Sequence, residues 1–129
     1  MKFDCKKISI SDEAFGCTLT LSEKKDNAAE QMKMSIDQIM NSSGQYLLLQ
    51  RTYPEDDFEN DYYYFETNDF DKSGELKSFI IELNKNRFLM KKENDLFEIT
   101  IKPNDEEYNN LKKILAKLTK DKGQLLIND

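Results

Sequence analysis

The chain of 129 residues contains no histidine and no tryptophan, and only 4 glycines and 2 prolines. Without histidine there is no histidine-dependent catalytic triad and no imidazole metal ligand. The scarcity of glycine and proline excludes collagen-like and low-complexity chains. No apolar run approaches the roughly 20 residues of a membrane span, and no signal-peptide pattern follows Met1. We therefore expect a cytoplasmic protein that is not inserted in a membrane.

The net charge limits the kinds of partner that the protein can bind. Lysine and arginine total 19 and aspartate and glutamate total 25, so the net charge is −6. A surface of this sign is repelled by phosphate backbones, so we expect no general nucleic-acid binding. A hydrophobic content of 38% in a chain of this length suffices for one core. The sequence therefore predicts a single domain over residues 1–129.

Two cysteines, Cys5 and Cys17, are present. Two thiols without histidine make neither a Cys2His2 zinc site nor a Cys–His nucleophile. They are either free, buried thiols in a reducing compartment or one disulfide across a first hairpin. The sequence leaves both interpretations open.

The N-terminal region has strand character. Over 15–21 apolar and small polar residues alternate, which predicts a strand with Phe15 on its buried face. The apolar parity changes between Phe3 and Ile8, which predicts a bulge near Lys6. Residues 11–14, of which the first three are polar, are interpreted as a hairpin turn.

Further patterns predict an α+β fold: a meander-like antiparallel sheet of six to eight strands with two helices packed against it. The run over 45–52 is nearly all apolar, so we expect a central strand buried on both faces. One helix is predicted over 26–41, and another, capped by Asn104, over 104–120 near the C-terminus. The other predicted strands cover 61–67, 76–83, 87–91, 96–101 and, as a short edge strand, 125–127.

Residues 69–74 resemble the first half of a calcium-binding loop, with Asp69 and Asp71 at its first and third positions. Such a loop needs a bidentate glutamate at its twelfth position, and that residue is Ile80. We therefore expect a polar turn and no metal. The chain also has no phosphate loop, glycine-rich fingerprint or nucleophile elbow, so we expect no catalytic residues, no cofactor and no enzymatic activity.

Carboxylates are concentrated over 55–61. They form either a solvated loop or an electrostatic patch for a basic partner. The neighbouring aromatics, Phe58 and Tyr62 to Tyr64, serve either as interface anchors or as sheet core. Arg51 is predicted to pair with Asp61 or Glu66 across the next strand.

The order of these segments is similar to a known family. The run YLLLQR (46–51) is followed by the acidic loop, then by YYFE (63–66), IIEL (80–83), NRFL (86–89) and an amphipathic helix. Over roughly residues 1–119 this order resembles the immunity protein 10 family of bacterial polymorphic toxin systems. The resemblance implies a small cytoplasmic protein that binds and blocks a cognate toxin domain without catalytic residues.

The hypothesis for function is therefore stoichiometric toxin binding. Toxin domains that cut nucleic acids are often basic, and an acidic inhibitor can be steered to them. The alternative is a small adaptor or ligand-binding domain that uses an aromatic sheet face. The predicted partner-binding residues are Glu55, Asp56, Asp57, Phe58, Glu59, Asp61, Glu66, Asp69 and Asp71.

Overall fold

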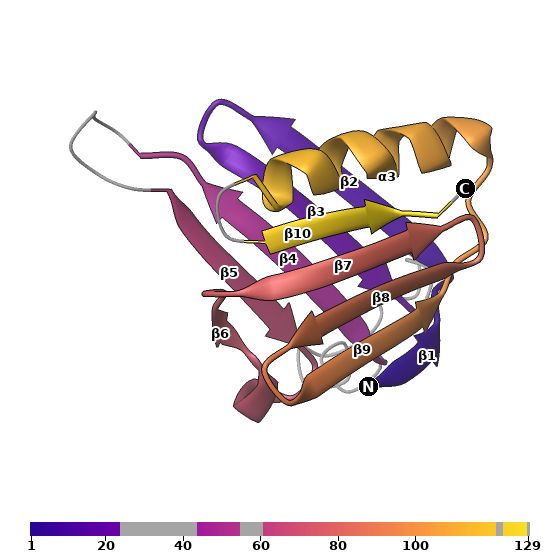
Figure 1. The fold of residues 1–129 in the computed structure, drawn as a ribbon, viewed down its shortest axis with the longest axis horizontal. Helices are drawn as coiled ribbons and strands as arrows, with labels where there is room; N and C mark the ends of the chain where they lie inside the picture. Colours follow the sequence, from indigo (N-terminus) through magenta and orange to yellow (C-terminus); the bar gives the residue numbers. More distant parts are fainter. Residues whose placement is uncertain (24–43, 55–60, 121–122, 129) are drawn as a thin grey trace, which may run out of the picture.

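The protein folds into two five-stranded sheets packed face to face, with an α-helix beside one of them (Figure 1). The structure is a computed structural model that describes residues 1–23, 44–54, 61–120 and 123–128. The front sheet contains, in spatial order, β1 (Lys2–Asp4), β9 (Asp95–Thr100), β8 (Arg87–Lys92), β7 (Phe79–Asn84) and β10 (Gly123–Ile127). The back sheet contains β2 (Lys7–Glu13), β3 (Gly16–Ser22), β4 (Tyr46–Thr52), β5 (Tyr62–Thr67) and β6 (Gly74–Glu75).

The α+β class and the mostly antiparallel pairing are confirmed, but the prediction of a single sheet is wrong. One face is buried in each of β3, β4, β5, β7 and β9, and the two sheets cover these faces mutually. Two pairings are parallel, β1 with β9 and β10 with β7, because these strands return to the sheet after long excursions of the chain. The predicted strand at 125–127 is confirmed as part of β10.

The core lies between the sheets. Leu19 and Leu49 from the back sheet and Ile81 and Ile99 from the front sheet are at most 1% exposed. The rings of Phe65 and Phe97 meet edge to face across the layers, with centroids 6.1 Å apart. In β4, Leu47 and Leu49 are buried while Leu48 is half-buried, so the expectation that this strand is buried on both faces is wrong.

The chain passes from the front sheet to the back sheet at its N-terminus. The Cys5 amide donates to the Thr100 carbonyl of the front sheet at 2.8 Å, and the next amide, that of Lys6, donates to Ser22 of the back sheet at 2.7 Å. This crossing, and not a bulge, reverses the apolar parity after Phe3. The predicted bulge is therefore wrong, since a bulge and a change of sheet give the same sequence pattern.

The β2–β3 hairpin is longer than predicted. Glu13 pairs with Gly16, so the turn consists of Ala14 and Phe15 and not of 11–14. Phe15 is 80% exposed at the tip, which corrects its predicted burial. A Cβ on Gly16 would lie 2.3 Å from the Arg51 carbonyl, so only glycine lets the hairpin lie this close to β4.

The helix α3 (Asp105–Leu118) extends the front layer beyond β10 and covers β2, β3 and β4 (Figure 1). Its apolar side chains are buried: Tyr108, Leu111, Ile114, Leu115 and Leu118. The predicted cap is confirmed, because Asn104 and Glu107 form a reciprocal capping box. The helix predicted over 26–41 lies outside the described residues. No helix of the described chain is long and apolar enough to cross a membrane.

We predict that Asn104→Ala lowers the free energy of unfolding by about 1 kcal/mol, because the first turn of α3 loses its cap. The matched control is Asn109→Ala, at an exposed position inside the same helix, where alanine favours the helical state. Urea unfolding followed by circular dichroism measures both variants. Equal destabilisation by the two substitutions would contradict the role of the cap.

Candidate functional site

The predicted partner-binding residues do not form one compact cluster in the described structure. Glu55, Asp56, Asp57, Phe58 and Glu59 lie outside the described residues. Asp61 precedes β5, Glu66 lies within it, and Asp69 and Asp71 follow it. A strand of six residues spans about 20 Å, so β5 separates Asp61 from the last two carboxylates.

Asp61, the residue that follows the 55–60 segment, pairs with Arg51. This is one of the two pairings that the sequence predicts for the arginine. The Asp61 carboxylate accepts from Nε of Arg51 and also forms an ion pair with Nη2 of the same guanidinium. Both side chains are largely buried, at 11% and 19% exposed. The pair therefore closes the two ends of the β4–β5 connection by a largely desolvated two-point contact.

Arg51 also ties the β4–β5 connection to the helix. Its Nη1 donates to the carbonyl of Lys117 in the last turn of α3 at 2.9 Å. The guanidinium carbon lies 5.2 Å from the centre of the Tyr53 ring and 5.6 Å from that of Tyr63. Burial acts to lower the pKa of Arg51, but the hydrogen bond to Asp61 and the nearby aromatic and acidic groups outweigh it and raise the pKa. The arginine therefore stays charged, and its positive charge interacts favourably with the negative, C-terminal end of the α3 dipole.

The neighbouring groups give this cluster a structural character. Lys117 forms an ion pair with Asp12 of β2, and Tyr53 donates to the same carboxylate at 3.5 Å. Burial raises the pKa of Cys17 and also that of Cys5, so both thiols stay protonated near neutral pH. Cys17 is buried and Cys5 is half-buried, and protonation disfavours reaction of either thiol, because the thiolate is the reactive form. The two cysteines are not joined, and Cys17 faces Asp12 in the strand register.

The outward face of β4 and β5 carries a second group, the tyrosine face, which consists of Tyr46, Tyr62, Tyr64 and Glu66. In β5 the inward residues Tyr63 and Phe65 are buried, whereas Tyr62 is 49% exposed and Tyr64 is half-buried. The core interpretation is confirmed for Tyr63, whereas Tyr62 and Tyr64 point outward and Phe58 lies outside the described residues, so the role of interface anchor stays a prediction. The tyrosine face runs along β5 from the base of the acidic segment.

Glu66 organises this face. Its Oε2 accepts from the Tyr46 hydroxyl at 2.8 Å, and its Oε1 accepts from the Tyr64 hydroxyl at 3.0 Å. Burial, followed by the hydrogen bond to Glu66, raises the pKa of Tyr46 to about 12. The hydrogen bond to Glu66 also raises the pKa of Tyr64. One carboxylate therefore fixes two phenol rings in place.

The surroundings of this face are mostly polar, with one lysine on the neighbouring strand β2. The register places Lys7 opposite Ser22, which lies opposite Tyr46. Register and burial place Thr18, Thr20, Leu48, Gln50 and Thr52 on the same side of the back sheet. Glu75 of β6 pairs with Tyr64 and adds a second carboxylate. Among the described residues of β3 to β6, no lysine or arginine occupies an outward position. On β3 to β6 the described outward charges, Glu66 and Glu75, are therefore both negative.

The segment that resembles a calcium loop forms a capped turn. The Asp69 carboxylate accepts from the Asp71 amide at 3.0 Å at the start of η1 (Phe70–Lys72). The buried hydroxyl of Thr67 donates to the Asp69 and Lys72 carbonyls. In the part of the chain that the structure describes, no three carboxylate or thiol groups are placed to hold a metal ion.

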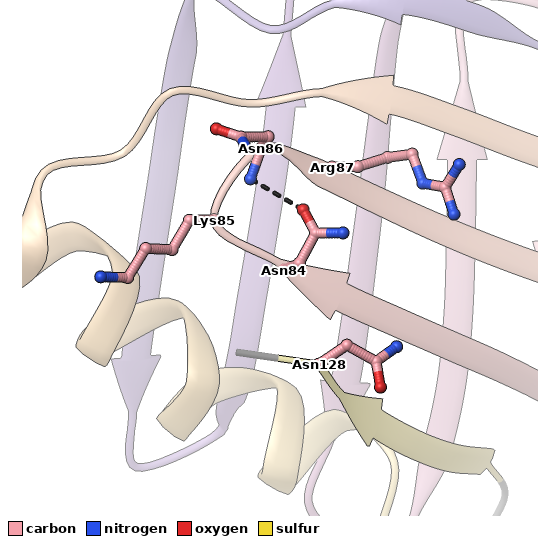
Figure 2. Close-up of a pocket in the computed structure, with 5 residues that line it drawn as sticks. All are labelled: Asn84, Lys85, Asn86, Arg87 and Asn128. Carbon is pink, nitrogen blue, oxygen red and sulfur yellow. Dashed lines mark hydrogen bonds between the residues drawn. The ribbon is translucent and has the colours of Figure 1, made fainter.

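A polar hollow of about 540 Å³ lies at the β7–β8 turn, open to solvent (Figure 2). It is lined by Asn84, Lys85, Asn86, Arg87 and Asn128. Figure 2 shows the cationic side chains of Lys85 and Arg87 extending in opposite directions from the turn. Asn84 is occupied by a hydrogen bond from the Asn86 amide at 2.8 Å. The two cationic side chains therefore do not converge on one point in this hollow.

No family model, no curated protein and no solved structure matches the chain. Glu66 is among the predicted partner-binding residues, but its role as the acceptor for two tyrosines does not follow from the sequence pattern. Tyr46 was absent from the predicted contact residues. The signal in the sequence is the contrast between Phe65 and Glu66, which with strand parity places Tyr62 and Tyr64 on the same face as Glu66.

We predict that Asp61→Asn lowers the free energy of unfolding by about 3 kcal/mol, because the largely buried Arg51 cation loses its counter-charge. Asp71→Asn, at an exposed carboxylate, is the control and should change it by less than about 0.5 kcal/mol. Denaturant unfolding at neutral pH compares the two. Indistinguishable midpoints would show that the pair does not hold the β4–β5 connection.

We also predict that Glu66→Gln lowers the pKa of Tyr46 from about 12 while leaving it above 10.0, because burial, the larger cause, remains. Because the pKa of Tyr46 is higher in the folded state than in the unfolded state, this residue contributes to the free energy of unfolding. The contribution is fully present below pH 10.0 and is lost as the pH rises through about 12. Ultraviolet titration of tyrosinate, with Tyr46→Phe to assign the transition, measures the shift. A Tyr46 titration that is identical with and without the carboxylate would refute the hydrogen bond.

Proposed function

We propose that the protein is a non-catalytic immunity protein that neutralises a basic toxin domain by binding it in equal stoichiometry. The observation that carries the proposal is the tyrosine face, where Glu66 orders two phenol rings on an outward sheet surface without lysine or arginine on the described strands β3 to β6. The resemblance to the immunity protein 10 family supports the same assignment from the order of sequence segments.

Tyrosine is well suited to such a surface. Its ring supplies a large contact area with few rotatable bonds, so little entropy is lost when a partner binds. The hydrogen bonds to Glu66, at 2.8 and 3.0 Å, restrict Tyr46 and Tyr64 before binding and reduce that cost further. Threonine and glutamine neighbours supply adaptable hydrogen bonds, as in protein-binding loops of antibodies.

Charge supports a basic partner. Glu66 and Glu75 lie on the face, and the 55–61 segment adds carboxylates to the chain next to it. Complementary charge accelerates encounter and disfavours wrong partners. The same carboxylates imitate the phosphates of a nucleic acid, which is the substrate class of many basic toxin domains. We place the protein in the cytoplasm, where its two thiols stay reduced.

A small-ligand domain is less well supported. Ligand sites are concave, mostly apolar and contain a few convergent polar groups. The hollow at the β7–β8 turn is polar and open, and its donors diverge. The outward tyrosines lie on a sheet surface, which fits a macromolecule better than a small molecule.

The proposal predicts that the protein, immobilised as bait, captures a basic toxin domain from a lysate of its own organism in equal stoichiometry and inhibits that domain when both are purified. The double variant Tyr62→Ser, Glu66→Lys should weaken capture at least about tenfold, because a central aromatic contact and the acceptor of two phenols are lost. Ile10→Ser, on β2 outside the tyrosine face, is the control and should bind like the original chain.

Two measurements complete this test. Association should slow as salt is added, because screening removes the electrostatic contribution to encounter. Mass spectrometry identifies the captured protein, and an activity assay with and without the bait measures its inhibition. Undiminished capture by the double variant would place the contact elsewhere, and a captured partner whose activity is unaffected would refute the immunity function.

A further inference from the structure

The outward face of the front sheet carries aliphatic side chains that the inter-sheet core does not use. Ile80, Leu96 and Leu126 are 37%, 47% and 48% exposed. Leu89 lies between them in β8 and is absent from the core cluster, although it is only 8% exposed. Four aliphatic residues therefore occupy one face of four adjacent strands.

The strand register connects them into one stripe. Leu126 pairs with Glu82, and Glu82 pairs with Leu89, while Ile80 pairs with Lys91 and Lys91 with Leu96. Across these four strands, each aliphatic residue therefore lies directly opposite a charged residue on the next strand. Successive aliphatic residues are diagonal neighbours. Diagonal neighbours on adjacent strands are within reach of long side chains. The stripe, defined by Leu126, Ile80, Leu89 and Leu96, crosses the sheet from β10 to β9.

The charges around the stripe balance. The outward cations of the front sheet are Lys2, Arg87 and Lys91, and its outward anions are Asp4, Glu82 and Glu98. Arg87 and Glu98 pair at 3.7 Å. Three charges of each sign give a net charge of zero, whereas the chain as a whole carries −6. This face therefore differs in its electrostatics from the negative tyrosine face.

We propose that this stripe is the contact surface of a symmetric dimer, with a second copy of this chain as its occupant. In a two-fold dimer each patch meets itself, so it must be electrostatically self-complementary. A two-fold axis along the Ile80–Leu89 diagonal places each of these two residues opposite the same residue of the partner. The same axis places Glu82 on the partner's Lys91 and Lys91 on the partner's Glu82.

This arrangement accounts for both the aliphatic and the charged residues. The aliphatic side chains along one diagonal exclude water, and Glu82 and Lys91 on the other diagonal meet opposite charges of the partner. A basic or acidic partner would be expected to select a face of one sign, and the front sheet has none. The dimer also leaves the tyrosine face of each copy directed away from the contact, because that face belongs to the other sheet.

The test is the molar mass of the purified chain, measured by sedimentation equilibrium from low micromolar to near-millimolar concentration. The original chain should pass from monomer to dimer. Ile80→Lys should stay monomeric over the whole range, because it places a cation on the axis. Ile10→Lys is matched in residue type and in its exposed fraction of 37%, but lies on β2, and should dimerise like the original chain.

A charge exchange tests the geometry. Lys91→Glu alone and Glu82→Lys alone should each dimerise at least about tenfold more weakly, because like charges meet across the axis. An equimolar mixture of the two should form a heterodimer that restores part of the lost affinity. Circular dichroism confirms that every variant is folded. A monomeric original chain, or an Ile80→Lys variant that still dimerises, would overturn the proposal, and an absent heterodimer would overturn the axis.

Discussion

The contact between the two sheets is the constraint on which the rest of the structure depends. Each sheet buries its more apolar face against the other sheet, and this contact removes both faces from water. The crossing at Cys5 and Lys6 joins the layers at the start of the chain, where adjacent amides bond to different sheets. The helix α3 then covers the part of β2, β3 and β4 that the front sheet leaves open. Because the core is internal to the pair, the outer faces carry the side chains that the core does not use, such as Tyr62 and Ile80.

Much of the fold follows from local patterns in the sequence. The alternation in β3 and β5, the capping box of α3 and the pairing of Arg51 with Asp61 all depend on neighbours along the chain or on the next strand. The division into two sheets does not, because alternation shows that one face is buried but not which element covers it. The same limit explains the predicted bulge, since a change of sheet and a bulge both reverse the parity after Phe3.

The sequence predicts which residue types form the candidate site but not how they are arranged on the sheet. Carboxylates and tyrosines are visible in the sequence, but their division depends on parity and register. Asp61 turns inward to Arg51 and serves the fold, whereas Glu66, five residues later, turns outward and orders Tyr46 and Tyr64. Tyr46 enters the site because β4 and β5 are adjacent, with Leu48 opposite Glu66. A charge run read along the chain cannot distinguish these two roles.

We propose that the two outer faces have different occupants, a toxin domain on the back sheet and a second copy of the chain on the front sheet. Hydrogen–deuterium exchange of the protein alone and with its captured partner tests this claim most directly. We predict that the partner slows exchange in β4 and β5, within residues 46–52 and 62–67, while β7 and β8 are unchanged at fixed protein concentration. Slower exchange in β7 and β8 with β4 and β5 unchanged would contradict the account.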